Sequence, residues 1–412
     1  MSDHDFDENT ANEATGFSGF GGHPLTVNVQ SDGAAAVSAI ESMETGNYEI
    51  AANLLSLGIE DAEQFVAAAS IPEVKEELAS ALGLKKQRFQ SLLQSVESLL
   101  PADRTELVST PAPKEFGLGV LAPPPEMIES AEMSAMSSEA ASAVSLPGAV
   151  NLIPYMPPIR NQGPRGTCVA FSLTALNEYI LRRQNVIQNL SEQHLYYETK
   201  LIDGSPTGCG TWQVKAVIAL LNRGQCREQV WPYNPNLPCN NHGPLPAQAR
   251  PDGLHYRRST IAVPARNVTA YKNHMALQRP VTLSIPVYNS WYQSAETKRS
   301  GRITMRIGNE PSVGGHAVCL VGYQDSANSP GGGYFIVRNS WNTTWAYNSP
   351  YGAGYGTIPY QYITNEAWEA FTSSFAAAPL GDDDANNGET SDEKETVTIQ
   401  VGSNVKITIS AE

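Results

Sequence analysis

The chain has 412 residues and a formal net charge of -15, from 27 Lys and Arg residues against 42 Asp and Glu residues. This acidic balance argues against a nucleic acid or an anionic membrane surface as the main partner. No uninterrupted apolar run is long enough to cross a bilayer. The length exceeds that of one ordinary domain, so we expect one large domain with smaller attachments.

The N-terminus reads Met1-Ser-Asp-His-Asp-Phe, without the basic and apolar regions of a secretory signal. Five cysteines, at positions 168, 209, 226, 239 and 319, are too few and too odd in number for a disulfide scaffold. We therefore expect a cytoplasmic protein, with secretion by another route left open.

The first hundred residues divide into two parts. Residues 1–33 are rich in Gly, Asn and Asp without periodicity, which predicts a disordered lead-in. Residues 34–101 are predicted to form a small helical domain similar to helix-hairpin-helix modules. Its apolar residues recur at three-and-four spacing up to Pro101, as in Phe89, Leu92, Leu93, Val96, Leu99 and Leu100. Its acidity disfavours nucleic acid, so we expect a protein-interaction module or a pro-domain.

The rest of the chain alternates between linkers and ordered segments. Residues 102–147 are rich in Pro, Ser and Ala and are predicted to be a linker. Residues 148–378 mix helical and strand patterns, which predicts an α+β domain that contains all the catalytic candidates. Residues 379–395 form an acidic linker, and the alternating residues of 396–412 predict a β-hairpin tail.

Cys168 is the first candidate catalytic residue. It opens a helical stretch that is apolar most of the way round, which predicts a buried helix with Thr167 as its N-cap. A cysteine at a helix N-terminus has a lowered pKa and favours the nucleophilic thiolate. A lone cysteine is more often a small buried side chain, so a catalytic role for Cys168 depends on the residues that accompany it. Gln162 precedes it in a Gly-rich loop and could form an oxyanion hole with the backbone N–H of Cys168.

His316 and Asn339 complete the set. His316 stands at the start of a buried strand pattern, and Asn339 follows another apolar run. The Asn amide can accept a hydrogen bond from one imidazole nitrogen and leave the other facing the thiol, while Trp341 and Trp345 shield the pair. Taken alone, each of these residues is explained equally well by packing in the protein core as by a catalytic role. Together with Cys168 and Gln162 they predict nucleophilic acyl transfer without a metal or a cofactor.

The region from about residue 148 to 371 resembles the papain family of cysteine peptidases, specifically its intracellular-type bacterial branch. The matching segments are Pro158-Ile-Arg-Asn-Gln-Gly, Gly166-Thr-Cys-Val-Ala-Phe, Leu190-Ser-Glu-Gln-His-Leu-Tyr-Tyr, Trp231-Pro-Tyr, Pro280-Val-Thr-Leu-Ser-Ile, Gly315-His-Ala-Val-Cys-Leu-Val-Gly-Tyr and Val337-Arg-Asn-Ser-Trp. The resemblance implies a two-lobed fold, with a helical lobe and a β-barrel-like lobe on either side of a peptide-binding cleft.

The same resemblance assigns roles residue by residue. It makes Gln162 the oxyanion donor, Cys168 the nucleophile, His316 the base and Asn339 its orienting partner. Gly210 is expected to border the strand that pairs with the substrate, and the tryptophans at 341 and 345 are expected to lie beside the substrate. The implied substrate is a peptide or a protein.

The cysteines depart from the family pattern. Arg165 stands where secreted members carry a half-cystine, so the disulfide that would hold Cys209 is expected to be missing. That absence favours a reducing compartment. Cys226 and Cys239 flank the Trp-Pro-Tyr loop and could pair with each other.

The family's usual helical propeptide signature is not seen in the N-terminal part. We hypothesise that the Pro-rich stretch Ala122–Pro125 lies in or beside the cleft, and that cleavage between about Pro101 and Leu146 releases activity. The expected function is a cysteine endopeptidase made as a zymogen. An exopeptidase, an amidase or a peptide ligase would use the same chemistry. A non-catalytic interaction protein on a peptidase fold is the alternative from another class.

Overall fold

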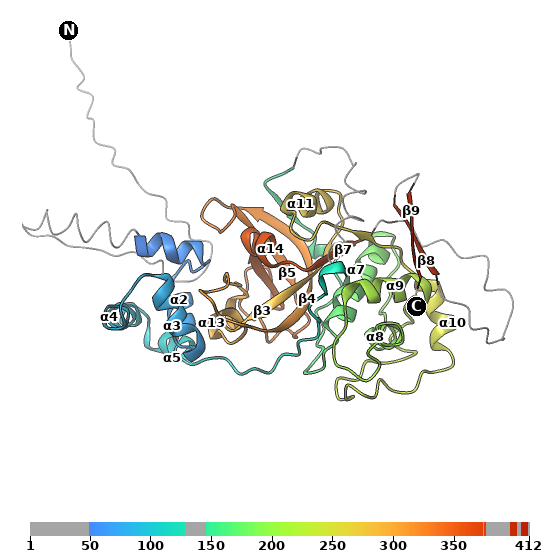
Figure 1. Cartoon of the computed structure of the whole chain (residues 1–412), viewed down its shortest axis with the longest axis horizontal. Coiled ribbons are helices and arrows are strands. Elements are labelled where there is room, and N and C mark those ends of the chain that lie inside the picture. The colour runs from blue at the N-terminus through green and yellow to red at the C-terminus, as the bar shows by residue number, and fades with distance from the viewer. Residues whose placement is uncertain (1–48, 128–145, 374, 376–395, 402–404, 411–412) are drawn as a thin grey trace, which may run out of the picture.

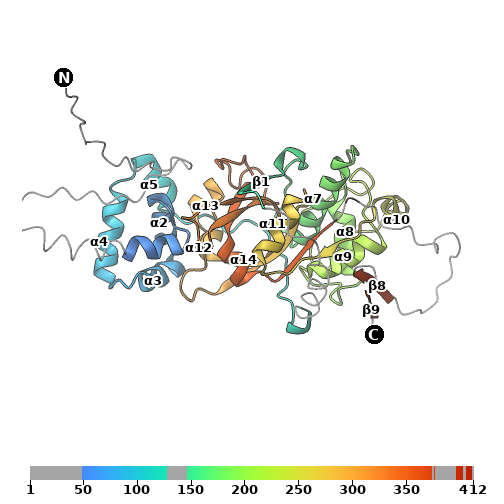
Figure 2. The same ribbon diagram turned by 90° about the horizontal axis from the view of Figure 1, so that it is seen from above.

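The computed structural model describes residues 49–127, 146–373, 375, 396–401 and 405–410. The predicted lead-in at residues 1–33 and the acidic linker at 379–395 lie outside the described residues. Figures 1 and 2 show three units in a row: an N-terminal helical unit, a sheet lobe and a helical lobe. None of the helices in the described ranges combines the length and the apolar character that a membrane span requires.

The helical unit spans residues 49–108. After a first helical stretch at residues 49–56 come α2 (Ala62–Ala69), α3 (Pro72–Ala81), α4 (Lys86–Glu97) and α5 (Ala102–Val108). Its core is built by buried apolar side chains that include Phe65, Leu78, Phe89 and Val96. Helix α5 falls in the region predicted to be linker, because Pro101 occupies the N-cap of a further helix as well as ending the previous run. The predicted linker therefore begins after Val108.

The helical lobe is organised around α7 (Cys168–Arg183), which is buried along most of its length. Helices α8 (Glu192–Lys200), α9 (Gln213–Asn222) and the short α10 (Ala249–Gly253) belong to the same lobe (Figure 1). A helix that is apolar on nearly all sides is stable only inside a protein, so the sequence of α7 fixes its central position. It packs against the sheet as well as against α8 and α9.

The sheet lobe contains an antiparallel sheet of seven strands within the described residues, in the order β2-β7-β3-β4-β5-β6 with β1 paired to β4. The strands are β1 (Ala149–Asn151), β2 (Ile261–Ala262), β3 (Val281–Tyr288), β4 (Ser312–Asp325), β5 (Gly333–Arg338), β6 (Tyr355–Pro359) and β7 (Glu369–Thr372). Helices α11 (Val268–Ala276), α12 (Asn289–Tyr292), α13 (Ala295–Ser300) and α14 (Tyr360–Glu366) flank them.

Strand β4 joins the two lobes because its side chains alternate between their cores. Ala317 and Cys319 pack with α7, while Val318 and Leu320 pack in the core of the sheet lobe. A strand buried on both faces reads as a continuous apolar run, which is how residues 316–321 appear in the sequence. The fold is thus a two-lobed α+β fold. Near the C-terminus, β8 (Thr396–Val401) and β9 (Val405–Ser410) pair with each other in a separate two-stranded sheet.

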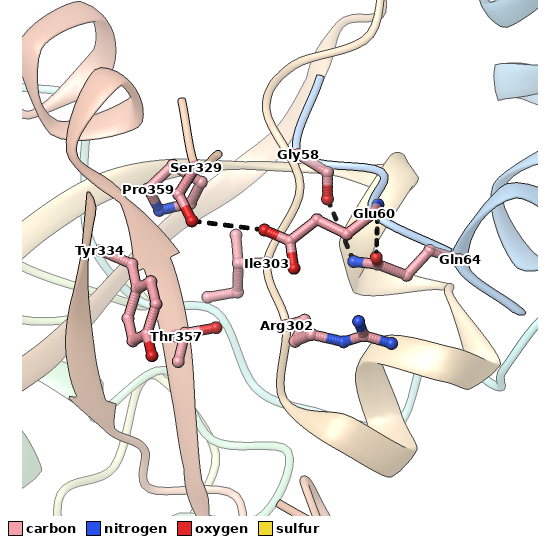
Figure 3. A pocket seen from close by; sticks show the side chains of 9 residues that line it. All are labelled: Gly58, Glu60, Gln64, Arg302, Ile303, Ser329, Tyr334, Thr357 and Pro359. Carbon is pink, nitrogen blue, oxygen red and sulfur yellow. Dashed lines mark hydrogen bonds between the residues drawn. The ribbon is translucent and has the colours of Figure 1, made fainter. Parts of the chain in front are cut away.

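The helical unit docks on the sheet lobe through charged side chains. Arg302 of the sheet lobe forms ion pairs with Asp61 at the N-cap of α2 and with Glu296 of α13. Arg104 of α5 approaches the same Glu296 at 3.2 Å. Beside this cluster lies a small pocket between the two units, where the hydroxyl of Ser329 donates a hydrogen bond to Glu60 at 3.3 Å (Figure 3). The docking interface therefore contains buried ion pairs, and it also contains an apolar contact, because Ile307 of the sheet lobe packs in the core of the helical unit.

Candidate active site

Cys168 is the first residue of α7, and its side chain is fully buried at the junction of the two lobes. Burial raises the pKa of its thiol to about 11, although nearby backbone N–H groups, including those of Ala317 and Gly119, oppose this effect. The thiolate expected from the helix N-terminus is therefore not favoured in this state, because desolvation outweighs the helix dipole. Thr167 occupies the N-cap position, but its hydroxyl pairs with that of Tyr233 at 2.7 Å and does not cap the helix.

His316 lies on β4 and pairs with Asn339, which follows β5. The distance from its Nε2 to Asn339 Oδ1 is 2.8 Å, and this oxygen also accepts the backbone N–H of Ser340. Within the described residues, the Nδ1 atom of His316 has no hydrogen-bond partner. Trp341 stacks on the imidazole at a centroid distance of 4.3 Å. Burial lowers the pKa of His316 to about 4, against the effect of the Asn339 hydrogen bond, so the ring is neutral in this state.

Gln162 is buried in the loop before Cys168. Its Nε2 donates hydrogen bonds to the carbonyl of Gly117 at 3.0 Å and to that of Arg165 at 2.9 Å. Its Oε1 accepts a hydrogen bond from Ser340 Oγ at 2.6 Å. Ser340 thereby connects Gln162 to Asn339, a contact that the sequence analysis missed. Its only signal was its place inside the Asn-Ser-Trp motif.

A segment of the chain itself occupies the cleft between the lobes. We call residues 112–122 the cleft segment; in Figure 1 it runs from the end of α5 below the sheet toward α7. On the side of the sheet lobe, the backbone N–H groups of Gly119 and Val120 both donate to the carbonyl of Gly315 at 3.0 Å. The residue that follows Gly315 is His316. The segment is therefore hydrogen-bonded to the residue that precedes the candidate base.

The cleft segment is bonded to the helical lobe as well. Gly117 N donates to Gly163 O at 3.1 Å, Thr211 N donates to Gly119 O at 2.9 Å, and Leu121 N donates to Thr211 O at 3.1 Å. Trp212 Nε1 donates to Ala122 O at 3.3 Å, so the start of the predicted Ala122–Pro125 stretch does lie beside the cleft. The residues that fill the cleft are those just before it.

Glycines allow this close approach. A Cβ atom on Gly119 would lie 2.3 Å from the backbone of Gly166, and one on Gly117 would lie 2.7 Å from the carbonyl oxygens of Gly163 and Arg165. Real Cβ atoms essentially never come so close to backbone atoms, so any other residue at either position must displace the segment. The cleft segment is therefore fitted to the loop that carries Gln162 and Cys168.

The three predicted substrate-binding residues lie at different depths. Gly210 has a positive φ of 76° and faces the cleft segment, since a Cβ atom there would lie 2.7 Å from Gly119 O. Trp341 donates its indole N–H to Gly117 O at 3.2 Å and stacks on Phe116 at 4.8 Å. Trp345 is buried in the core of the sheet lobe and meets Trp341 edge-on at 5.9 Å, so it supports the site from behind.

The expectation that Cys209 lacks a disulfide is wrong, and the possible pairing of Cys226 with Cys239 is not formed. Cys209 forms a disulfide with Cys239, whereas Cys226 is a free, buried thiol. The chain after the Trp-Pro-Tyr loop brings Cys239 back to the loop that contains Gly210, which spacing in the sequence could not reveal. The argument for a reducing compartment that rested on an unpaired Cys209 therefore loses its basis.

The chemistry available at this site is that of a thiol, an imidazole and two amides. Within the parts of the chain that the structure describes, no group of three or more His, Cys, Asp or Glu side chains could hold a metal ion. The thiol, the neutral imidazole with its unpaired Nδ1, and the amide donor of Gln162 border one stretch of extended backbone. These are the components that covalent acyl transfer requires.

Comparisons with known proteins agree with this chemistry. The sequence model of the papain family cysteine protease matches residues 151–358, just over half of the chain. An uncharacterized peptidase C1-like protein of Acanthamoeba polyphaga mimivirus is 25% identical over 54% of this chain and 68% of its own length. Cathepsin K of Gallus gallus is 31% identical over 46% of this chain and 53% of its own length. Among solved structures, xylellain, a cysteine protease from Xylella fastidiosa, is 24% identical with a TM-score of 0.49, over 63% of this chain and 95% of its own.

The curated relatives support the peptidase family, but this chain matches only part of their length. The chain spans 53% of cathepsin K and 61% of peptidase 1 of Euroglyphus maynei, which is 31% identical to it over 52% of this chain. The curated relatives named here come from a virus and from eukaryotes, so they do not support the bacterial branch that the sequence analysis predicted. The match to the family's sequence model, on residues that include Cys168 and His316, is independent of that branch. The chain belongs to the papain family of cysteine proteases.

Proposed function

We propose that this protein is a cysteine endopeptidase made as an autoinhibited zymogen. Cys168 is the nucleophile, His316 the base and Asn339 its orienting partner, and Gln162 with the backbone N–H of Cys168 forms the oxyanion hole. One observation carries the proposal: an extended segment already lies across these groups, with its backbone hydrogen-bonded to both walls of the cleft. A cleft that binds the backbone of an extended chain is suited to peptide substrates of many sequences.

The reaction follows from the positions of the side chains. His316 Nδ1 takes the proton of the Cys168 thiol, and the sulfur attacks the substrate carbonyl carbon. The carbonyl oxygen becomes an oxyanion that accepts a hydrogen bond from Gln162 Nε2. The imidazolium then protonates the leaving amine, the C–N bond breaks and a thioester remains. His316 removes a proton from a water molecule that attacks the thioester, and the thiol is regenerated with release of the acid.

The cleft segment is poorly placed to be cleaved, which supports an inhibitory role. Gly119 lies against the thiol, and its carbonyl is bonded to Thr211 N rather than to Gln162. The carbonyl that does meet Gln162 is that of Gly117, two residues earlier. Neither of these two carbonyls is therefore offered to the nucleophile and to the oxyanion donor together. The pKa of Cys168, raised to about 11, and that of His316, lowered to about 4, keep both groups neutral while the segment is in place.

The cleft also carries a side-chain pocket. Val120 is only 5% exposed and packs in the apolar cluster that contains Cys168 and Ala317. A Cβ atom on Gly315 would lie 3.0 Å from Val120 Cβ and 2.7 Å from the indole of Trp368, so both side chains cover this glycine. We propose that substrates place a short apolar side chain where Val120 lies.

The helical unit has its own role in this proposal. Its helices α2 and α5 contact α13 of the sheet lobe, and the cleft segment begins four residues after Val108. A partner for the N-terminal helices is therefore present within the same chain. The unit anchors the inhibitory segment, in place of the long helical propeptide that the sequence lacks.

An endopeptidase is favoured over an exopeptidase because chain extends from the site in both directions. Phe116 packs on Trp341 on one side of the thiol, and Ala122 is held by Trp212 on the other. A cleft that holds backbone on both sides accommodates the interior of a substrate chain. Masses of the fragments from an unstructured protein substrate would distinguish internal cuts from stepwise removal of terminal residues.

The experiment that tests the function compares full-length protein with the variant Gly119→Val, each with and without Cys168→Ala. The bulky side chain cannot fit against Gly166 and should displace the cleft segment. Gly148→Val is the matched control, because nothing lies within 4 Å of a Cβ atom there. The assay is cleavage of internally quenched peptides that carry a central Val or Leu.

We expect Gly119→Val to cleave the peptides at least about tenfold faster than the wild type or the Gly148→Val control, and Cys168→Ala to abolish cleavage in every background. A folded Gly119→Val protein whose thiol is reactive but which cleaves nothing would contradict the peptidase assignment. A wild type as active as Gly119→Val would contradict autoinhibition alone.

A further inference from the structure

Arg165 lies in the loop between Gln162 and Cys168, and its side chain is buried, with 5% of its surface exposed. Its Nη1 donates to Gln193 Oε1 at 2.6 Å and to the carbonyl of Asn234 at 3.2 Å. Its Nη2 lies 3.4 Å from Nδ1 of His242, whose Nε2 is within 2.8 Å of the carbonyl of Pro206. With the Nε2–H donated to that carbonyl, Nδ1 of the neutral ring accepts from the guanidinium.

Two aromatic rings enclose the guanidinium, and no carboxylate is bonded to it. Its central carbon lies 5.0 Å from the centre of the Tyr196 ring and 5.7 Å from that of Tyr233. Among the described residues, no ion pair of Arg165 is recorded, and burial lowers the pKa of the group. A buried cation without a carboxylate is costly, so stability alone gives little reason to place it here.

The backbone of Arg165 is part of the candidate oxyanion hole. Its carbonyl accepts Gln162 Nε2 at 2.9 Å and the backbone N–H of Thr167 at 2.8 Å. Tyr233, which flanks the guanidinium, donates its hydroxyl to the carbonyl of Gln162 at 2.8 Å. Tyr233 therefore holds the backbone of Gln162, and the Arg165 side chain holds the residue whose carbonyl accepts the side-chain amide of Gln162.

We propose that Arg165 is a positioning residue for the oxyanion hole. Its guanidinium fastens the loop of residues 162–168 to α8 through Gln193 and to the loop of residues 233–242. The inference rests on the proposed function, because an oxyanion hole has a role only if the thiol attacks a carbonyl. Loss of the fastening lets the Gln162 amide move away from the developing oxyanion, which affects the transition state more than substrate binding.

The Cys209–Cys239 disulfide fastens the same loop at another point. It joins the loop of residues 233–242 to the loop that contains Gly210, on the opposite side of the cleft segment from Gly315. Arg165 contacts that loop at Asn234 and His242, on either side of Cys239. The disulfide connects the loop of residues 233–242 to the loop that contains Gly210, and the Arg165 guanidinium connects the same loop to the one that carries Gln162.

The test uses the full-length chain that carries Gly119→Val, so that the cleft is open. Into this parent we would introduce Arg165→Met, Arg165→Lys, Gln162→Ala and the double variant Arg165→Met with Gln162→Ala. Arg183→Met is the matched control, because Arg183 also lies over a tyrosine ring, that of Tyr155 at 4.3 Å, but at the far end of α7. Each variant is measured for kcat, KM, affinity for a peptide aldehyde and rate of alkylation by a peptide epoxide.

The two inhibitors separate the oxyanion hole from the thiol. The thiol adds to the aldehyde carbonyl and forms a tetrahedral adduct whose oxygen occupies the oxyanion hole, whereas epoxide opening alkylates sulfur without such an oxyanion. We expect Arg165→Met to lower kcat and aldehyde affinity at least about tenfold, with KM and the epoxide rate within about threefold of the parent. The double variant should be no worse than Gln162→Ala alone, because both changes remove the same interaction. Arg183→Met should match the parent.

Arg165→Lys keeps the charge but loses the planar fork, so we expect little rescue. If Arg165→Met does not fold, Arg165→Lys and Tyr233→Phe provide the same readouts, since Tyr233→Phe loosens the loop without removing the guanidinium. Unchanged kcat in the folded variants, an epoxide rate that falls as much as kcat, or additive losses in the double variant would overturn the role of Arg165. An inactive parent with a reactive thiol would overturn the proposed function and this role with it.

Discussion

The helical unit and the cleft segment are neighbours in sequence but are held to the rest of the protein by different forces. The helical unit is joined to the sheet lobe by buried side chains: the charges of Arg302, Asp61 and Glu296, and the apolar side chain of Ile307, which packs in the core of the unit. The cleft segment is held by backbone hydrogen bonds and by glycines that allow close approach. Anchoring and blocking are thus separate physical tasks, and each can be disturbed without the other.

The largest effect should come from displacing the cleft segment. The pKa of Cys168 is raised to about 11 from 9.0 because the thiol is buried, and Gly119→Val should return it to solvent. Two pKa units correspond to about a hundredfold change in thiolate population at neutral pH, and relief of steric protection adds to it. We therefore expect alkylation of Cys168 by a small thiol reagent at pH 7 to accelerate at least about a hundredfold.

The measurement is the mass of the alkylated peptide that contains Cys168, as a function of time. The two other free cysteines, Cys226 and Cys319, are buried and serve as internal references. Gly119→Ala and Gly117→Ala should give graded, smaller accelerations in that order, since their Cβ atoms would meet backbone at 2.3 and 2.7 Å. Equal rates in the wild type and in Gly119→Val would show that the segment does not protect the thiol.

The second prediction concerns a variant that weakens docking of the helical unit but leaves the contacts of the cleft segment in place. Arg302→Ala leaves Asp61 buried without its cationic partner, whereas Glu296 keeps Arg104 and Arg299. Breaking a buried pair by removing one partner typically costs about 3–5 kcal/mol. We expect a clearly lower temperature for unfolding of the helical unit, detected by limited proteolysis along a temperature series. Alkylation of Cys168 should accelerate by less than about tenfold, because the backbone bonds of the cleft segment are unchanged.

The matched control is Lys114→Ala, which removes an exposed pair with Glu73 at 3.9 Å. Exposed pairs contribute about 0–1 kcal/mol, so this variant should behave as the wild type. If Arg302→Ala exposed the thiol as fully as Gly119→Val does, docking of the helical unit and occupation of the cleft would be one cooperative event rather than two separate ones.

The smallest effect concerns pH and the pocket at Glu60 (Figure 3). Burial raises the pKa of the Glu60 carboxyl above its ordinary 4.5, while Arg302 opposes the rise and Asp61 adds to it. A raised carboxyl pKa gives a contribution to stability that is complete below about pH 4.5 and is lost as the pH rises through the raised value. Docking of the helical unit should therefore weaken slightly as the pH rises.

Glu60→Gln removes this titration and can keep the hydrogen bond from Ser329. We expect the melting temperature of the variant, relative to that of the wild type, to increase from pH 4.5 toward pH 8. Parallel melting curves across that range would show that Glu60 does not titrate on docking. A variant that loses stability faster than the wild type would reverse the predicted sign.

The sequence was most informative where chemistry and order along the chain were both constrained. Cys168, His316 and Asn339 were identified as a set because acyl transfer needs those groups, and the pairing of His316 with Asn339 is present in the structure. It was least informative about long-range pairing, as for Cys209 with Cys239. Spacing along a chain does not report which loops return to the same wall of a cleft.

Burial was the other quantity that the sequence could not supply. The expectation of a lowered Cys168 pKa used the helix dipole alone and could not include the desolvation that burial of the thiol causes. Leu99 was grouped with the apolar helical residues, yet it is 61% exposed, because α4 ends at Glu97. Both errors concern exposure to solvent, which the spacing of apolar residues along the chain does not report.

The short connection between α5 and the cleft segment has a consequence for how inhibition responds to substrate. Because inhibitor and enzyme share one chain, the segment competes at an effective local concentration of about millimolar or above, which dilution of the protein does not change. A substrate must therefore compete with an intramolecular inhibitor, which cannot diffuse away from the enzyme. A single cut downstream of residue 122 would not lower that concentration, since the segment stays joined to the docked helical unit. On this view, the cleft becomes available when the backbone hydrogen bonds of the segment itself break, whether or not the helical unit stays docked.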